Sequence, residues 1–309
     1  MVAQVYKSTG SWYTLKDEQG KFWNGRVKGV LKLDNITSTN PLAVGDMVEV
    51  ELESELDNSV MILSIADRHN YINRQSPRHK HQHHIVASNM DQAVLIVTLR
   101  EPRTSQGFID RFLVAAEMYH VTPIIVFNKS DLYKQKDMDQ FAHYLSMYGA
   151  IGYKVLLVSA EKKEGVEELK AVLKDKTSLL SGHSGVGKSS LLNLISPGIQ
   201  LKTGEISGWS GKGQHTTTFA EMFDLSFGGR VIDTPGMREF GLVDIEKQEL
   251  SHYFPEMRDR LTNCQFNNCL HVNEPGCAIK EAVINKEIEE DRYVSYVNIL
   301  DSLGEVSNY

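Results

Sequence analysis

Four nucleotide-binding motifs occur in this chain, and their order constrains the fold more than any other feature of the sequence. A phosphate-loop pattern, Gly-x4-Gly-Lys-Ser, spans residues 182–189, and an Asp-Thr-Pro-Gly motif spans residues 233–236. An Asn-Lys-Ser-Asp motif of the type that reads guanine precedes both at residues 128–131, and Ser-Ala follows it at residues 159–160. An ordinary GTPase domain begins with the phosphate loop and ends with the guanine reader. The order here therefore predicts a circularly permuted GTPase domain.

The middle of the chain has the pattern of a mostly parallel α/β sheet. Apolar runs bounded by turns alternate with helical patterns, for example at residues 110–119 and 165–173. Strands buried on both faces have this appearance because helices cover both sides of a parallel sheet. The GTPase domain is predicted to span residues 85–243. Its strands are predicted at residues 93–97, 123–127, 154–158, 177–180, 219–223 and 229–232.

The phosphate loop follows one of these runs and precedes a helical pattern at residues 190–195. Its glycines let backbone N–H groups turn inward around phosphates, and the helix N-terminus adds a favourable dipole. Lys188 is expected to reach the β and γ phosphates, and the Ser189 hydroxyl to bind the Mg²⁺ that accompanies GTP. The alternative, an ordinary glycine-rich turn, would not need the flanking strand and helix. The predicted phosphate-binding residues are Gly182, His183, Ser184, Gly185, Val186, Gly187, Lys188, Ser189 and Ser190.

The guanine reader follows another apolar run, at the strand end where α/β proteins bind ligands. Asp131 can accept hydrogen bonds from both N1–H and the exocyclic amine of guanine, a pair of donors that adenine lacks, so GTP is favoured over ATP. Asn128 is expected to bond the outer edge of the purine, and the stem of Lys129 to pack along the base. Ser159 and Ala160 strengthen the assignment because they follow the next run.

The two switch segments are predicted on either side of residues 219–232. Asp233 is placed to hold Mg²⁺ through water, and the Gly236 N–H to sense the γ phosphate. Residues 211–218 lie where the first switch belongs, and by spacing Thr217 completes the Mg²⁺ shell. The alternative for this segment is a flexible Gly/Thr-rich loop, and a switch ordered only by nucleotide satisfies both interpretations.

The residue that promotes hydrolysis is expected to be His215. Many GTPases place a glutamine directly after Asp-x-x-Gly to orient the attacking water, but this chain has Met237 there. An imidazole can orient or deprotonate water near neutral pH, and His215 has the right location. The alternative is a loop histidine without a chemical role. Without the glutamine, slow intrinsic hydrolysis and activation by a partner are expected.

A metal site is predicted in the C-terminal part, residues 244–309, which is otherwise helical, notably at residues 278–283 and 287–303. Three thiols and one imidazole fall within fourteen residues, and all three cysteines of the chain belong to this set. A Cys₃His set satisfies tetrahedral Zn²⁺ with no open position, so one structural zinc per chain is expected. Three unrelated buried thiols are the alternative, and a redox pair is disfavoured because no Cys-x-x-Cys occurs. The predicted ligands are Cys264, Cys269, His271 and Cys277.

The N-terminal part, residues 1–67, contains about five short strands with glycine-containing turns. This pattern predicts a small Greek-key barrel, either an OB-fold or an SH3-like barrel. A linker follows at residues 68–84, with four basic side chains, five histidines and no acid. It could contact RNA phosphates, bind metal adventitiously or be solvated, and its charge beside the barrel favours RNA.

The bulk properties exclude some classes of protein. The 309 residues suggest two or three domains, and a formal charge of −7 argues against a polycation that coats nucleic acid. The sequence contains no apolar stretch of membrane-spanning length and no secretory signal pattern, so a cytoplasmic protein without a membrane partner is expected.

Together these features resemble the ribosome small-subunit-dependent GTPase A family (RsgA, also called YjeQ) over essentially the whole chain. The motifs that carry the resemblance are those at residues 128–131, 182–189, 215–218 and 233–236 and the Cys₃His loop. The resemblance implies an OB-fold, a central GTPase and a zinc-bearing helical domain. It also implies late maturation of the bacterial 30S subunit, contact with 16S rRNA, and stimulation by that subunit, with a monomer expected. The family histidine proposed to be catalytic corresponds to His215.

Two further expectations follow. The region 20–29 is less basic than the family barrel suggests, although Phe22 and Trp23 can stack on bases. The second switch runs through residues 237–240 into the zinc domain, so loss of the γ phosphate could re-aim that domain, with hydrolysis driving release from the subunit. The competing interpretations are a nucleotide-gated RNA-binding module whose hydrolysis is incidental, and a permuted GTPase of the large subunit.

Overall fold

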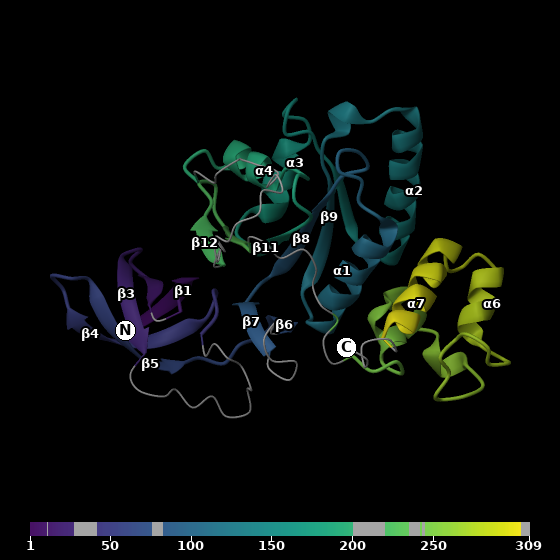
Figure 1. The fold of residues 1–309 in the computed structure, drawn as a ribbon, viewed down its shortest axis with the longest axis horizontal. Helices are drawn as coiled ribbons and strands as arrows, with labels where there is room; N and C mark the ends of the chain where they lie inside the picture. Colours follow the sequence, from purple (N-terminus) through teal and green to yellow (C-terminus); the bar gives the residue numbers. More distant parts are fainter. Residues whose placement is uncertain are drawn as a thin grey trace, which may run out of the picture.

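The computed structural model of the chain describes residues 1–10, 12–27, 42–75, 83–199, 220–234, 242 and 245–303. Figure 1 shows three units in a row: an N-terminal barrel, a central sheet with helices, and a C-terminal group of helices. The predicted fold class is confirmed: a barrel, a central phosphate-loop domain and a C-terminal cysteine–histidine cluster. Within the described residues, no helix combines the length and apolarity needed to cross a membrane.

The N-terminal unit is a closed five-stranded barrel. Its strands are β1 (Val2–Ser8), β2 (Tyr13–Asp17), β3 (Phe22–Val27), β4 (Met47–Ser54) and β5 (Ser59–Ile65). They pair in the order β1-β2-β3-β5-β4, and β4 pairs again with β1 to close the barrel. Because β3 runs parallel to β5, the topology is that of an OB-fold rather than an SH3-like barrel. Alternate residues of these strands, such as Val48, Val50, Val60 and Ile62, fill the interior.

A hairpin overlaps the predicted linker, residues 68–84, and its second strand continues to Ser88. Strands β6 (Tyr71–Gln75) and β7 (His83–Ser88) pair antiparallel and form a separate two-stranded sheet. Arg68 anchors the start of this segment to the barrel through two contacts of 2.6 Å to the buried carboxylate of Asp46. Ser88 donates to the same carboxylate. The basic tip, residues 76–82, lies outside the described residues, so its expected RNA contacts stay a prediction.

The central unit is a sheet with helices on both faces. Its strands are β8 (Gln92–Val97), β9 (Thr122–Phe127), β10 (Lys154–Leu157), β11 (Thr177–Ser181), β12 (Glu221–Asp224) and β13 (Arg230–Asp233), in the order β10-β9-β8-β11-β13-β12. All neighbours are parallel except β12 and β13. One face packs against α1 (Gln106–Met118) and α2 (Gln135–Ile151), the other against α3 (Val166–Leu173) and α4 (Lys188–Ile195).

The barrel and the central sheet are joined edge to edge. Lys7 of β1 pairs with Glu221 of β12 in antiparallel register, which makes one continuous sheet of eleven strands among the described residues. Side chains reinforce the junction: Tyr6 and Lys16 both bond to Asp224, at 2.7 and 2.5 Å. The strand that follows the predicted first switch therefore carries the barrel on its outer edge.

The C-terminal unit packs on helix α1. It consists of the short helices η2 (Leu250–Tyr253), α5 (Pro255–Arg258) and η3 (Leu261–Asn263), then α6 (Ala278–Ile284) and α7 (Glu290–Ser302). In Figure 1, the yellow α7 lies beside α1. Val114 of α1 shares a hydrophobic cluster with Phe254, Tyr296 and Ile299. The unit therefore shares a core with the GTPase unit.

A buried ion pair crosses the same interface. Arg292 of α7 and Asp110 of α1 are both fully buried, and their side chains meet at 2.5 Å. Arg292 also bonds Glu256 at 2.7 Å, while Tyr148 of α2 donates to Asp110 at 2.9 Å. Burial raises the pKa of Tyr148 well above its usual value, so its hydroxyl remains a donor. Four helices, α1, α2, α5 and α7, are fixed relative to one another by this network.

Replacing Asp110 by asparagine is expected to lower the free energy of unfolding by about 3 kcal/mol. The substitution keeps the shape of the side chain but removes one of the two carboxylates that neutralise a buried guanidinium. Urea titration of both proteins measures the difference. Asp291→Asn is the matched control, because Asp291 pairs with His143 at the surface and such exposed pairs contribute about 1 kcal/mol or less. Equal losses for the two variants would contradict the expected result.

Candidate functional site

The predicted nucleotide-binding motifs gather at the carboxyl ends of four parallel strands of the central sheet. The phosphate loop follows β11, Asn128 follows β9, Ser159 lies two residues after β10, and Asp233 ends β13. Parallel strands bring their carboxyl ends to one edge of the sheet, where ligands of α/β proteins bind. His215, Thr217 and Gly236 lie outside the described residues, so their predicted roles stay predictions.

Three glycines of the phosphate loop have backbone conformations that disfavour any other residue. The φ angles of Gly182, Gly185 and Gly187 are 141°, 83° and 94°. A Cβ atom on Gly187 would lie 2.4 Å from Nδ2 of Asn128, and one on Gly182 would lie 2.2 Å from the carbonyl oxygen of Ile96. The loop is therefore pressed against both β8 and the guanine reader.

Lys188 folds back over the loop that precedes it. Its ammonium group donates to the carbonyl oxygens of Gly182 and His183, at 2.5 and 3.0 Å. Burial lowers the pKa of Lys188, and the negative charge of Asp233 opposes that shift. These contacts hold the cation inside the loop, where phosphate oxygens would be its partners.

Asp233 and Ser189 are the described residues expected to contact Mg²⁺. Ser189 lies in the first turn of α4, directly after Lys188. Burial raises the pKa of Asp233, while Lys188 and the backbone N–H of Thr234 lower it. A half-buried carboxylate and a hydroxyl are hard oxygen donors, so this pair fits the partial ligand set that Mg²⁺ takes beside phosphates.

Asn128 connects three motifs through its side-chain amide. Its Nδ2 donates to the carbonyl of Val186 in the phosphate loop at 2.8 Å, and its Oδ1 accepts from the N–H of Ala160 at 3.2 Å. The side chain is almost fully buried. The contact with the purine stays a prediction, and the structure adds these two bonds within the protein. Asn128 therefore sets the spacing between the guanine-reading and phosphate-binding parts.

Ser159 positions the carboxylate of Asp131. The Ser159 hydroxyl donates to Oδ1 of Asp131 at 2.5 Å and accepts from the N–H of Lys162 at 3.0 Å. One carboxylate oxygen is thus engaged by the protein. This contact explains why a serine is present in the Ser-Ala motif: it fixes the orientation of Asp131, the residue expected to read guanine.

Two supporting residues were not found by sequence reasoning. Tyr133 donates to the carbonyl of Asn128 at 2.8 Å and accepts from the N–H of Leu99 at 3.0 Å, and burial raises its pKa to about 12. Phe108 of α1 packs against His183 of the phosphate loop, with ring centroids 3.8 Å apart and ring planes tilted by 30°. Neither residue belongs to a motif, and their contacts depend on the packing of α1 and β9.

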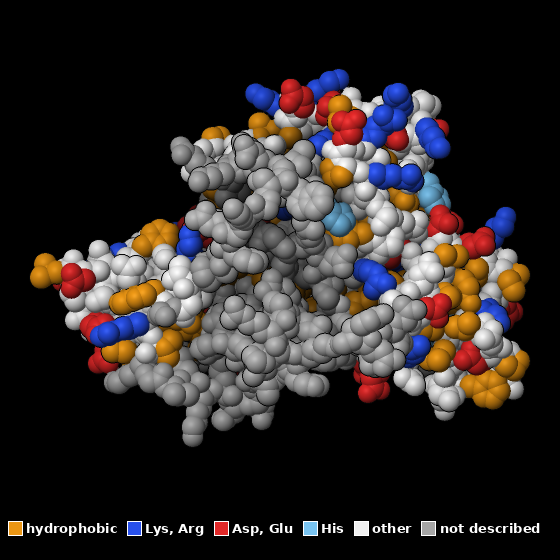
Figure 2. All heavy atoms as spheres, in the orientation of Figure 1, with side chains coloured by type: hydrophobic (Ala, Val, Ile, Leu, Met, Phe, Trp, Pro, Cys, Tyr) orange, Lys and Arg blue, Asp and Glu red, His pale blue; other side chains and the backbone are white. Residues whose placement is uncertain are grey.

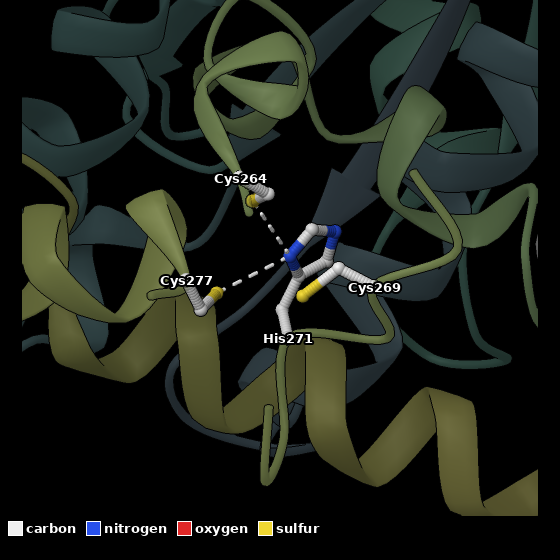
Figure 3. Close-up of side chains that lie close together, drawn as sticks. All are labelled: Cys264, Cys269, His271 and Cys277. Atoms are coloured by element: carbon white, nitrogen blue, oxygen red, sulfur yellow. Dashed lines mark hydrogen bonds between the residues drawn. The ribbon is translucent and has the colours of Figure 1, made fainter. Parts of the chain in front are cut away.

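The four predicted metal ligands come together in the C-terminal unit (Figure 3). Their ligand atoms all lie within 4.8 Å of one another, and Nδ1 of His271 lies 3.6 Å from Sγ of Cys264 and 3.4 Å from Sγ of Cys277. Bond lengths of about 2.0–2.3 Å in a tetrahedral site give ligand separations of roughly 3.5–3.8 Å. The cluster therefore has the dimensions needed to hold a metal ion.

The loop around the cluster is supported by the helices behind it. Tyr293 and Tyr296 of α7 donate to the carbonyls of His271 and Leu270, at 2.8 and 2.9 Å. Glu274 accepts from the backbone N–H groups of Leu270, Val272 and Asn273. Burial, together with the neighbouring thiols, raises the pKa of Cys269 to about 12. A cation that stabilises thiolates fits this set, since closely packed thiols resist ionising on their own.

Comparison with known proteins identifies two family models in this chain. The model of the RsgA GTPase matches residues 65–243, and the model of the RsgA N-terminal domain matches residues 3–60. Among curated proteins, the small ribosomal subunit biogenesis GTPase RsgA of Flavobacterium psychrophilum is 51% identical, covering 97% of this chain and 93% of that protein. The protein of the same name from Christiangramia forsetii is 48% identical, covering 100% and 98%.

Two solved structures share the whole fold. YjeQ from Thermotoga maritima superposes with a TM-score of 0.81 at 36% identity, covering 98% of each chain. YloQ, described as a circularly permuted GTPase, superposes with a TM-score of 0.77 at 32% identity, covering 100% of this chain and 96% of its own.

Proposed function

This chain belongs to the RsgA family and is a GTPase, and we propose that it acts in the biogenesis of the small (30S) ribosomal subunit. The observation that supports this most strongly is the convergence of the permuted motifs on the amide of Asn128, in a chain similar over its whole length to small ribosomal subunit biogenesis GTPases. In this proposal the protein is a cytoplasmic monomer that contacts 16S rRNA late in subunit maturation.

Different described residues bind different parts of GTP. Asp131, held by Ser159, reads the guanine, while Lys188 and the N–H groups of the phosphate loop hold the phosphates. Ser189, Asp233 and, by sequence, Thr217 would hold Mg²⁺, which supplies charge to stabilise the phosphate oxygens when bound. The Cys₃His cluster would hold a structural Zn²⁺, because four N and S donors leave no open position.

Contacts with rRNA are proposed to be local. On the face drawn in Figure 2, the acidic and basic side chains of the described residues are interspersed, so they form no single basic field there. Trp23 is buried in the barrel core and is not available to bases. Phe22 is half exposed, and Nζ of Lys16 lies 5.4 Å from the centre of its ring. Such a pair suits stacking on an unpaired base.

The proposed function is tested by measuring GTP turnover by the protein alone, with purified 30S subunits and with 50S subunits. Strong stimulation by 30S subunits alone is expected, because the chain lacks the glutamine that orients water in many GTPases and has Met237 in its place. Stimulation by 50S subunits instead would assign the protein to the large subunit.

Replacing His215 by alanine is expected to reduce 30S-stimulated turnover about a hundredfold, the size of a general acid–base contribution, and to leave GTP binding intact. The imidazole is proposed to orient the attacking water. Single-turnover hydrolysis with saturating 30S subunits, together with the Kd of a fluorescent GTP analogue, separates the two effects. His143→Ala, at an exposed histidine of α2, serves as a control for losing a histidine. Undiminished turnover of His215→Ala would remove His215 from the mechanism.

Hydrolysis is proposed to drive release from the subunit. Residues 235–241 connect Asp233 to the C-terminal unit along the chain. In the described part, that unit is packed on α1 through Arg292 and Asp110. A conformational change of the second switch would therefore pull on the C-terminal unit while the packing on α1 holds that unit in place.

A further inference from the structure

Lys7, Glu221 and Asp233 form one row across three neighbouring strands. Lys7 of β1 is the register partner of Glu221 of β12, and Glu221 is the register partner of Asp233 of β13. Directly opposite residues of antiparallel strands project from the same face, with Cβ atoms about 5 Å apart. The three charged side chains therefore share a face, and the row runs from the barrel into the nucleotide site.

Along this row, two carboxylates lie at the centre, with a lysine on either side. Two carboxylates, Glu221 and Asp233, stand opposite each other, which is an unfavourable pair in a sheet. Lys7 is bonded to Glu221, with Nζ 2.7 Å from Oε2 and both side chains about one-third exposed. On the other side, the positive charge of Lys188 acts on Asp233. Glu221 is thus bonded to a cation from the barrel, whereas Asp233 has nearby the charge of Lys188, whose ammonium group bonds backbone carbonyls of the phosphate loop.

We propose that Lys7 is a positioning residue of the nucleotide site: it holds and neutralises Glu221, so that only Asp233 presents a free carboxylate to the phosphates and Mg²⁺. This inference rests on the proposed role of Asp233 at the Mg²⁺ site. Without Lys7, Glu221 is a second uncompensated anion beside the phosphates. It repels the nucleotide most when no Mg²⁺ is present to offset the charge.

Lys16 provides the matched control. It lies on the same barrel and bonds β12 across the same junction, but through Asp224, at 2.5 Å. Asp224 is paired with Arg230 at the opposite end of β12 from Asp233. Loss of Lys16 therefore removes an ion pair across the same junction without leaving a free anion next to Asp233.

The experiment measures the Kd of a fluorescent GDP analogue for the full chain, in excess EDTA and in excess Mg²⁺. Lys7→Met is expected to weaken binding about three- to tenfold in EDTA and less in Mg²⁺, the size of effect expected for one uncompensated, partly exposed anion near the phosphates. Lys7→Arg and the double variant Lys7→Met/Glu221→Gln are expected to bind as the parent does. Lys16→Met is expected to be unchanged in both buffers. Thermal melting of each variant reports the stability of the junction.

Identical Kd values for Lys7→Met and Lys16→Met, or failure of Glu221→Gln to restore binding, would overturn the inference. Asp233→Asn tests the premise separately, since it is expected to abolish the strengthening of GDP binding by Mg²⁺. If Asp233→Asn has this effect and Lys7→Met has none, only the role of Lys7 is refuted. If Asp233→Asn leaves the Mg²⁺ effect intact, the proposed Mg²⁺ site and the role of Lys7 are both refuted.

Discussion

Replacing Asp131 by asparagine is expected to lower the affinity for GTP about a thousandfold and to make XTP the preferred nucleotide. The carboxylate accepts two hydrogen bonds from guanine. Asparagine loses one of these bonds and places an amide N–H against the guanine donors, and together these changes cost about 4 kcal/mol. Ser159 determines which way the new side chain faces, because its hydroxyl donates to Oδ1 at 2.5 Å. Oδ1 of the asparagine keeps that contact, so Nδ2 faces the base and meets the carbonyl that xanthine has in place of the guanine amine.

Competition of unlabelled GTP and XTP against a fluorescent nucleotide measures this change. Asp137→Asn is a suitable control, because Asp137 lies six residues further on and bonds Arg100 and the backbone of Lys134 instead of the base site. The control is expected to keep the parental preference for GTP. A parallel loss of affinity for both nucleotides in Asp131→Asn would show that Asp131 supports the fold of the site without reading the base.

Replacing Cys277 by serine is expected to abolish tight metal binding and to unfold the loop between η3 and α6. Structural Zn²⁺ contributes about 10–16 kcal/mol of apparent binding free energy in small metal-dependent units, and a serine hydroxyl does not replace a thiolate. Cys277 is buried, and its sulfur lies 3.4 Å from Nδ1 of His271. Elemental analysis gives the metal content, and limited proteolysis maps the exposed chain between residues 261 and 278.

Chelation of the parent protein provides a second approach to the same question. Removal of the metal is expected to reproduce the proteolysis pattern of Cys277→Ser, and added Zn²⁺, but not Mg²⁺, to reverse it. Thr262→Ser, an exposed substitution in the same segment, is the control and should leave metal content unchanged. A fully metal-loaded Cys277→Ser variant that resists protease would contradict the four-ligand assignment.

Much of the fold could be predicted from the sequence, since it depends on local patterns. The strands β8, β9, β10 and β11 were found from apolar runs, and the metal ligands from their spacing. Helix α2 (Gln135–Ile151) was not predicted. The hairpin of β6 and β7 is not predicted either, since its strands are short and lack the continuous apolar runs of the central strands.

The remaining features depend on residues far apart in the chain. Lys7 and Glu221 are 214 positions apart, and Arg292 and Asp110 are 182 apart. No periodicity within one segment indicates which distant strand or helix it will meet. The role of Asn128 shows the same limit, because the motif identifies the residue whereas its bonds to Val186 and Ala160 follow from packing. The choice between two barrel types likewise required the parallel pairing of β3 with β5.

The position of β11 in the sheet has a consequence for how the protein is made. This strand lies between β8 and β13, yet it is translated after β9 and β10. A nascent chain growing at about 5–20 residues per second exposes one edge of β8 for several seconds before β11 leaves the ribosome. Until then the three strands β8, β9 and β10 can assemble only as a half-sheet with an open, apolar side. Folding of the nucleotide site is thus delayed until after Asp233 has been added, when translation of the chain is already more than about three-quarters complete.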